Sequence, residues 1–231
     1  MQNQIDLQEI TEKLSNLWNL LTEEEKTEFS QSLSVKTFKK NETVYHEGES
    51  PDHLLCLLSG KVKIFRDGVC GRSQIMRVMR PVQYFGYRAS LAGEPYITAA
   101  AAFEESIICC IPMKVVKKVM SQNIAICHFF IRELATDLGI ADCRTVSLTQ
   151  KHIRGRLAEA ILFLKKTYGV SADGTLGILL SREDLANLSN MTTSNAIRTL
   201  STFANEGLIA ISGRTIKILQ EDVLLSISKI G

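Results

Sequence analysis

The sequence lacks any long hydrophobic run. No apolar stretch approaches the roughly 18–20 residues that a membrane-spanning helix needs. The first residues, MQNQIDLQEITEKL, are amphipathic and acidic, without the basic and then apolar regions of a signal peptide. With 231 residues, 45% of them hydrophobic and 23% charged, the chain has the composition of an ordinary globular protein with one or two domains. We therefore expect a cytoplasmic protein with no membrane partner.

Metal-binding spacings are also missing. The six cysteines form no CxxC pair, and in a cytosolic chain this pattern favours reduced, buried thiols that pack like small apolar residues. They are Cys56, Cys70, Cys109, Cys110, Cys127 and Cys143. We expect neither a disulfide framework nor a metal site.

No constellation typical of an enzyme is present. The sequence shows no serine–histidine–aspartate set, no HExxH motif and no phosphate-binding loop, and the four histidines are dispersed. They are His46, His53, His128 and His152. The chain is therefore not expected to be an enzyme.

A strongly basic balance is the next feature that is absent, because the net charge is only +2. Residues 149–231 hold ten Lys and Arg against seven Asp and Glu, a balance of +3, whereas residues 1–148 hold seventeen against eighteen, a balance of −1. The C-terminal part is the more basic one, but this difference alone does not establish nucleic-acid binding.

The N-terminal half is dominated by short apolar stretches. Residues 7–21 carry apolar side chains at helical spacing, and Thr22 with Glu25 has the form of a capping box that starts a second short helix. From Val35 to Pro112, short apolar segments are broken by Gly, Pro, Asp and Asn, which predicts strands joined by tight turns. Many short strands of this kind favour a β-barrel or roll.

A long helix with a heptad seam follows. Eight positions are spaced alternately by three and four residues, which is typical of a helix that pairs in a coiled coil. These positions are Ile124, Cys127, Ile131, Leu134, Leu138, Ala141, Thr145 and Leu148. The pattern favours a homodimer, and the alternative is a helix buried in the core of its own chain.

The last third has the order of a winged helix-turn-helix. Ser181 is a good N-cap for a helix over REDLANLSN, a short turn at Asn190-Met191 follows, and a second helix starts near Thr192. GLIAISGRTIKIL then predicts two strands around Ser212-Gly213.

The second of these helices has residues suited to the major groove. Thr192 is expected to cap it, and a polar face is predicted to carry Thr193, Ser194, Asn195 and Arg198. Apolar packing is assigned to Ala196, Ile197, Leu200 and Phe203. Asn195 can pair with adenine, and Arg198 with guanine or a phosphate.

Backbone contacts to DNA are expected from two further places. Ser181 and Arg182 begin the preceding helix, whose N-terminus can reach phosphate oxygens. Arg214 and Lys217 lie on the predicted hairpin and are assigned to a wing that contacts the DNA backbone.

These motifs together resemble the Crp–Fnr family of bacterial transcription regulators. The segment LSREDLANLSNMTTSNAIRTLSTFANEGLIAISGRTIKI is similar to the family's helix-turn-helix and wing, and GRLAEAILFL to the helix that opens its DNA-binding domain. Gly48, Gly60 and Phe85-Gly86 match glycines and a turn of the family's roll. The resemblance implies an α+β fold: an N-terminal double-stranded β-helix like that of cyclic-nucleotide-binding domains, a long dimerisation helix and a C-terminal winged helix-turn-helix.

The resemblance also implies an organisation and a set of partners. Residues 1–120 would form the sensor domain, residues 121–148 the dimerisation helix and residues 149–231 the DNA-binding domain. A homodimer would bind a two-fold symmetric operator on double-stranded DNA, and RNA polymerase would be a further partner. The alternative is a regulatory module that binds a ligand and acts through a protein partner.

The sensor half departs from the family's cyclic-AMP site. Tyr87 replaces the glutamate that holds the ribose, Ile97-Thr98 replace the Arg-Ser pair that holds the phosphate, and Ala141-Asp142 replace the Thr-Ser pair that contacts adenine. A buried phosphate would lack its bidentate partner, so cyclic AMP is not expected to bind. The residues assigned to an effector pocket are Gly86, Tyr87, Arg88, Thr98 and Ala99. Arg88 could serve another anion, although an exposed surface arginine is the favoured interpretation.

No other cofactor is predicted. The iron–sulfur branch of the family has a cysteine cluster near its N-terminus, whereas this chain has no cysteine before Cys56. For haem, His46, Cys70, Cys127 and His128 form no spacing that predicts ligation. The effector is either an unknown small molecule or absent, in which case the regulator is constitutive.

The reading helix departs from the family as well. Thr193-Ser194 stand where the common Arg-Glu pair is found, while Arg198 is retained. Loss of a carboxylate that accepts from cytosine should change the DNA sequence that is recognised.

Overall fold

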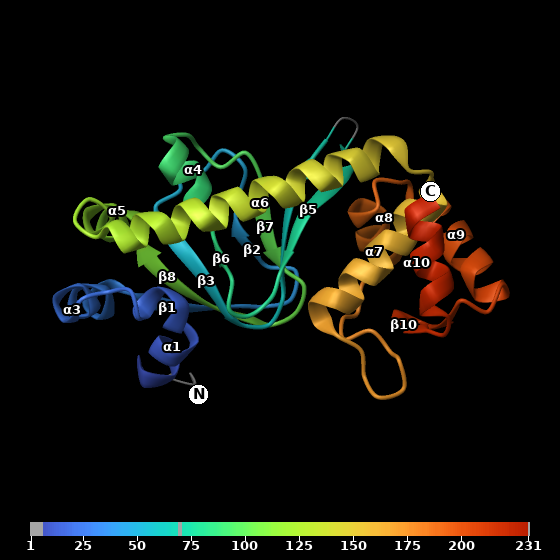
Figure 1. Ribbon diagram of the computed structural model, residues 1–231, viewed down its shortest axis with the longest axis horizontal. Helices are drawn as coiled ribbons and strands as arrows, with labels where there is room; N and C mark the ends of the chain where they lie inside the picture. Colours follow the sequence, from blue (N-terminus) through green and yellow to red (C-terminus); the bar gives the residue numbers. More distant parts are fainter. Residues whose placement is uncertain (1–6, 69–70, 231) are drawn as a thin grey trace. The chain divides into compact units, whose positions relative to one another are not determined.

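The computed structural model describes residues 7–68 and 71–230, and its elements are labelled in Figure 1. Cys70 lies outside the described residues. The chain forms two compact units: one extends to Arg66 and includes Arg77–Leu138, and the other comprises Asp67–Met76 and the chain from Gly139 onward. The division falls inside one long helix, so the sequence-based domains at 1–120, 121–148 and 149–231 stay a prediction.

Three short helices begin the first unit: α1 (Leu7–Lys13), α2 (Ser15–Trp18) and α3 (Glu23–Ser32). The continuous helix expected over residues 7–21 is therefore wrong, because the chain breaks between α1 and α2 at Leu14. Both hydrogen bonds of the predicted capping box are present. The Thr22 hydroxyl accepts from the Glu25 backbone N–H at 3.3 Å, and the Glu25 carboxylate accepts from the Thr22 N–H at 2.8 Å.

Two four-stranded sheets make the roll. One has the order β1-β8-β3-β6 and the other β2-β7-β4-β5. Their strands are β1 (Ser34–Phe38), β2 (Thr43–Tyr45), β3 (His53–Ser59), β4 (Val62–Asp67), β5 (Ser73–Met79), β6 (Tyr84–Phe85), β7 (Ala99–Ala102) and β8 (Ser106–Pro112). The β3 strand is buried along five consecutive residues, Leu54–Leu58, which indicates that both of its faces are covered.

The core of this unit has two apolar clusters. One packs the outer face of the β3–β8 pair against the N-terminal helices, α5 (Met113–Met120) and the start of α6 (Ile124–Gln150). The other fills the inside of the roll with side chains such as Leu57, Phe85 and Ile108. Cys56, Cys109 and Cys110 are buried as expected, whereas Cys127 is half-buried and Cys143 is exposed. Burial raises the pKa of the Cys109 thiol to about 12, so this thiol stays protonated at neutral pH.

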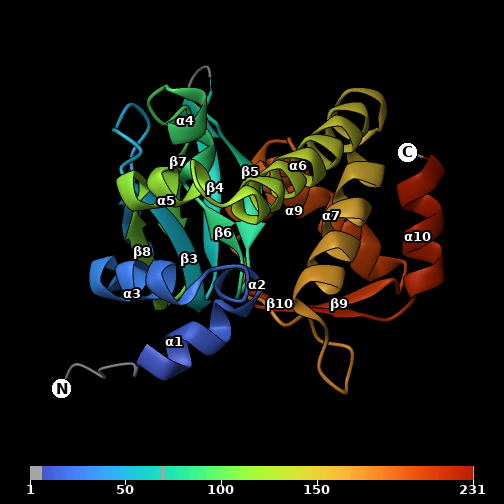
Figure 2. The ribbon, with the colours of Figure 1, turned by 60° about the vertical axis from the view of Figure 1, so that its left-hand side comes forward.

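The second unit is mainly helical. It contains α7 (Ile153–Tyr168), α8 (Arg182–Leu188), α9 (Thr193–Asn205) and the antiparallel hairpin of β9 (Ile209–Ser212) and β10 (Thr215–Ile218). The final helix α10 (Glu221–Ile230), which the sequence reading did not anticipate, packs against α7 (Figure 2). Leu157, Ile161, Leu185, Leu200 and Phe203 are fully buried in this unit. None of the helices in the described part of the chain combines the length and apolarity that a membrane crossing requires.

Candidate nucleic-acid interface

The helix-turn-helix begins at a well-formed cap. The Ser181 hydroxyl accepts from the Asp184 backbone N–H at 2.9 Å and lies 2.6 Å from the Asp184 carboxylate, to which it donates. The next residue, Arg182, donates from Nη2 to the Gly213 carbonyl at 2.7 Å and is half-buried. Arg182 therefore ties the start of α8 to the tip of the β9–β10 hairpin, a positioning contact that the sequence reading missed when it assigned this residue to a phosphate.

The turn between α8 and α9 is short and fixed by the backbone. Asn190 adopts φ +49°, a left-handed conformation that asparagine tolerates better than most residues. Met191 is buried, and its N–H donates to the Ala186 carbonyl at 3.0 Å. The predicted turn at Asn190-Met191 is thus present and sets the angle at which α9 leaves α8.

Thr192 caps α9, since its hydroxyl accepts from the Asn195 backbone N–H at 3.3 Å. The buried face of α9 carries Ala196, Thr199, Leu200 and Phe203. The opposite face exposes Thr193, Ser194, Ile197, Arg198 and Ser201. α9 has no acidic residue, so a polyanion meets no carboxylate on this helix.

Two assignments on α9 change with the structure. Ile197 is 48% exposed, so its predicted role in core packing is wrong. Asn195 is half-buried at the border of the exposed face, and its pairing with adenine stays a prediction. Exposure follows the side of α9 that faces α7 and α8, and Ile197 lies off that side.

The hairpin carries the two expected wing cations in different surroundings. Arg214 is exposed in the turn between β9 and β10. Lys217 is half-buried on β10, and its Nζ lies 3.8 Å from the Asp173 carboxylate. Hydrogen bonds from Ser171 and Thr175 hold the pKa of Asp173 down at about 2, so this carboxylate stays charged and offsets the charge of Lys217. Arg214 is thus the better placed of the two for a phosphate contact.

Contacts from distant residues fix the ends of the helix pair. The Arg154 guanidinium donates to Glu206 at 2.9 Å and lies 4.9 Å from the centre of the Phe203 ring, at the end of α9. Arg144 on α6 donates to the carbonyls of Ile75 and Met76, each at 2.6 Å, and to that of Leu188 at 2.9 Å. Neither arginine shows its role in the local sequence, because its partners are far along the chain.

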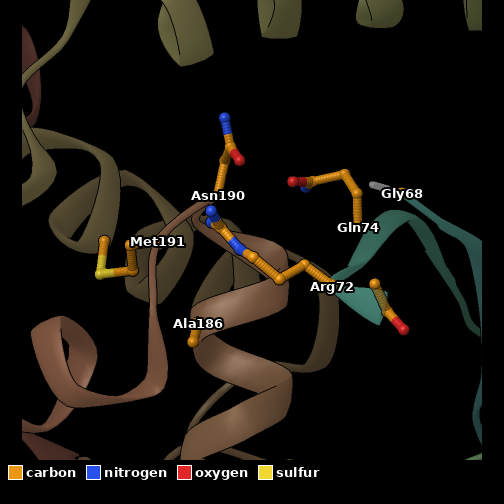
Figure 3. Close-up of a pocket in the computed structure, with 7 residues that line it drawn as sticks. Gly68, Arg72, Gln74, Ala186, Asn190 and Met191 are labelled. Carbon is orange, nitrogen blue, oxygen red and sulfur yellow. The ribbon is translucent and has the colours of Figure 1, made fainter. Parts of the chain in front are cut away.

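A cavity of about 270 Å³ adjoins the α8–α9 turn (Figure 3). The Asp67–Met76 segment and the helix pair line it, both within the second unit. Its lining residues are Gly68, Arg72, Ser73, Gln74, Ala186, Asn190 and Met191. The sequence reading did not find this cavity, which has no local sequence signal.

The residues assigned to an effector pocket have mixed surroundings. Gly86 has φ +84° and precedes α4 (Tyr87–Ala92). Tyr87 is only 2% exposed, its ring centre is 5.0 Å from that of Phe130, and its hydroxyl has no hydrogen-bond partner among the described residues. Burial raises the pKa of Tyr87 to about 12. Arg88 is exposed and pairs with Glu94 at 2.8 Å, in agreement with the surface interpretation of this arginine.

The other pocket residues belong to the β7 side of the roll. Thr98 and Ala99 are half-buried, and Thr98 is hydrogen-bonded to Tyr45, whose ring stacks on that of Tyr96 with centres 3.8 Å apart. Arg77 interacts electrostatically with both Tyr45 and Tyr87. The cation nearest to these predicted positions is therefore Arg77 rather than Arg88.

Arg77 forms an ion pair with Asp137 of α6. Burial lowers the pKa of the Arg77 guanidinium, and the neighbouring carboxylate compensates its charge. Ile97, at the position where the family has its phosphate-binding arginine, is exposed. Asp142 on α6 is exposed as well.

The predicted seam of α6 is largely uncovered within one chain. Ile124, Ile131 and Leu138 are 68%, 60% and 63% exposed, respectively. Ala141 and Thr145 are also exposed, while Cys127, Leu134 and Leu148 are half-buried. Ile140 and Val146 add two exposed apolar side chains that the heptad reading did not include.

Comparisons with known proteins agree with this architecture. Residues 35–123 match the family model of the cyclic nucleotide-binding domain, and residues 155–227 match that of the Crp-like helix-turn-helix domain. The chain is 26% identical over 197 residues to the CRP-like cAMP-activated global transcriptional regulator of Mycobacterium tuberculosis, covering 84% of this chain and 88% of that one. This relative is a transcription regulator and not an enzyme, in agreement with the sequence-based expectation.

Solved structures give the same picture. A CRP-family transcriptional regulator from Thermus thermophilus is 25% identical, with a TM-score of 0.73 and coverage of 84% of this chain and 96% of that one. FixK2 from Bradyrhizobium japonicum shares the fold at 21% identity, with a TM-score of 0.75 and coverage of 84% and 96%. The two family models, the order of the two domains and these relatives together show that the chain belongs to the Crp–Fnr family of transcription regulators.

Proposed function

We propose that this regulator binds a two-fold symmetric operator as a homodimer in the bacterial cytoplasm, reading the DNA with the exposed face of α9. The observation that carries the proposal is the division of α9 into two faces. Leu200 and Phe203 are buried and hold the helix on its unit, while Thr193, Ser194 and Arg198 are exposed on the other side. Hydroxyl and guanidinium groups on such a face are suited to base edges and phosphates in the major groove.

The exposed ridge of α6 supports the homodimer. Burying three large apolar side chains such as Ile124, Ile131 and Leu138 against a second copy would remove them from water, and each contributes about 1.5–3 kcal/mol when fully buried. A symmetric dimer presents two copies of α9, and this is the reason for expecting a symmetric operator. By analogy with the family, RNA polymerase is the proposed protein partner.

The proposed effector is a small molecule other than cyclic AMP, or none. An anionic phosphate in the roll would need a cation without a protein partner, whereas Arg77 is paired with Asp137 and Arg88 with Glu94. Tyr87 is buried against Phe130, at the position of the family's ribose-binding glutamate. No iron–sulfur cluster or haem is proposed.

Selection of bound sequences tests the proposal. The purified full-length protein is incubated with random duplex DNA, with and without cyclic AMP, and the bound fraction is sequenced. We expect a palindromic sequence to be enriched equally in both cases. Arg198→Ala should weaken binding to this duplex by roughly tenfold to a hundredfold, the effect of about 1–3 kcal/mol for one base-reading arginine.

Arg80→Ala is the matched control, because Arg80 is an exposed arginine of the first unit. It should bind like the parent protein, and both variants should keep the parent's mass in sedimentation. Failure to enrich any sequence, or equal binding by the parent and Arg198→Ala, would contradict the proposal and favour a module that acts through a protein partner.

A further inference from the structure

Ile197 is the one large apolar side chain on the exposed face of α9. Its neighbours at helical spacing are Thr193, Ser194 and Ser201, and Arg198 follows it directly. Single exposed apolar residues are common on protein surfaces, so exposure alone carries little information. The position is what matters here, because Ile197 lies in the middle of the surface that is proposed to meet base edges.

The chain gains little from isoleucine at this position. The side chain is 48% exposed, so its burial contributes only part of what a core isoleucine would, and isoleucine has a lower helix propensity than alanine. The packing of α9 is carried by other residues, Ala196, Leu200 and Phe203, which are all fully buried. Helix stability therefore does not explain the choice of residue.

DNA offers one apolar feature in the major groove, which is the C5-methyl group of thymine. A side chain without a donor or acceptor can recognise no other base-edge group. Ile197 is also β-branched, so its χ1 angle is restricted and its methyl groups have a fixed direction. We propose that Ile197 contacts the methyl group of a thymine in each half of the operator, close to the base that Arg198 reads. This inference rests on the proposed function, and it adds thymine as a required base.

Replacement of thymine by deoxyuridine tests the contact directly, since deoxyuridine lacks only the C5-methyl group. In the duplex obtained by selection, each thymine is replaced in turn, together with its symmetry mate. At one symmetric pair of positions, the parent protein should lose about fourfold in affinity per half-site, the effect of one buried methyl group, and about fifteenfold for the pair. Ile197→Ala should bind both duplexes within about twofold of each other, because its contact with the methyl group is already lost.

Three further variants make the result specific. Ile197→Val keeps a branched side chain and should keep most of the discrimination between thymine and deoxyuridine. Arg198→Ala should bind more weakly overall but keep the parent's ratio. Val223→Ala removes an exposed apolar side chain from α10 and should change neither value.

The outcomes separate the two proposals. If the parent protein enriches no sequence, the proposed function fails and this inference fails with it. If an operator is found but contains no thymine whose replacement weakens binding, the inference alone is wrong. It is also wrong if Ile197→Ala keeps the parent's discrimination at that position.

Discussion

Replacing Gly60 by alanine should destabilise the roll far more than the same change at Gly48. Both glycines have φ +88°, a left-handed conformation that costs an L-residue about 1–2 kcal/mol. The lower entropy of alanine in the unfolded chain offsets about 0.4–1 kcal/mol of this. At Gly48 a new Cβ meets no described atom within 4 Å, so we expect a loss of only about 1 kcal/mol in the free energy of unfolding.

Gly60 lies in the turn between β3 and β4, and its surroundings leave no room. A Cβ there would lie 2.4 Å from Ser106 Oγ, 2.5 Å from the Glu105 carbonyl oxygen and 2.7 Å from Ser106 Cα. Two of these atoms are backbone, which cannot move aside without shifting β8. Overpacking typically adds about 1–3 kcal/mol, so we expect a total loss of about 2–4 kcal/mol for Gly60→Ala.

Urea denaturation followed by tryptophan fluorescence measures this difference in the relevant unit. Trp18 is the only tryptophan of the chain, and it packs against the apolar cluster of the first unit, to which Gly48 and Gly60 also belong. The two variants share the backbone cost, so their difference isolates the steric one. Equal midpoints for the two variants would refute the close contact between the β3–β4 turn and β8.

The remaining predictions concern the helix ridge and the buried tyrosines. Leu138→Asp places a charge on the exposed ridge of α6 and should give monomers in sedimentation, whereas dimers of unchanged affinity would count against this interface. Burial raises the pKa of Tyr87 from its ordinary value of 10 to about 12, so the unfolded chain loses its proton first as the pH rises. Stability should therefore be fully present below pH 10 and fall between pH 10 and about 12, a loss that Tyr87→Phe should reduce in alkaline denaturation. A Tyr87→Phe variant that unfolds over the same alkaline range as the parent would show that this tyrosine is not a source of the effect.

Local patterns were sufficient to predict the elements of the DNA-binding unit. The caps at Ser181 and Thr192 and the turn at Asn190 depend on residues within three or four positions of each other, so the sequence contains all of the partners. Ile197 shows where this reasoning ends. Helical spacing allowed it to join the apolar face of α9, and only the packing of α9 against α7 and α8 places it on the exposed side.

The sensor unit depended more on tertiary structure. Substitutions at the family's cyclic-AMP positions were visible in the sequence, and they indicated that the site had changed. The pairing of Arg77 with Asp137 was not visible, because the two residues come from β5 and α6 and are 60 positions apart. The sequence reading therefore considered Arg88, the nearest cation along the chain, whereas the fold brings Arg77 to the buried tyrosines.

The sequence by itself determined the order of elements, the heptad ridge and the chemistry available on α9, because periodicity, caps and turn residues act over a few neighbouring positions. The tertiary structure alone decided which side chains are exposed and which distant residues meet. Arg144 is an example, since its guanidinium joins carbonyls of β5 and α8 that are more than forty residues away in the chain. Burial and charge pairing depend on such long-range contacts, and a linear pattern contains no record of them.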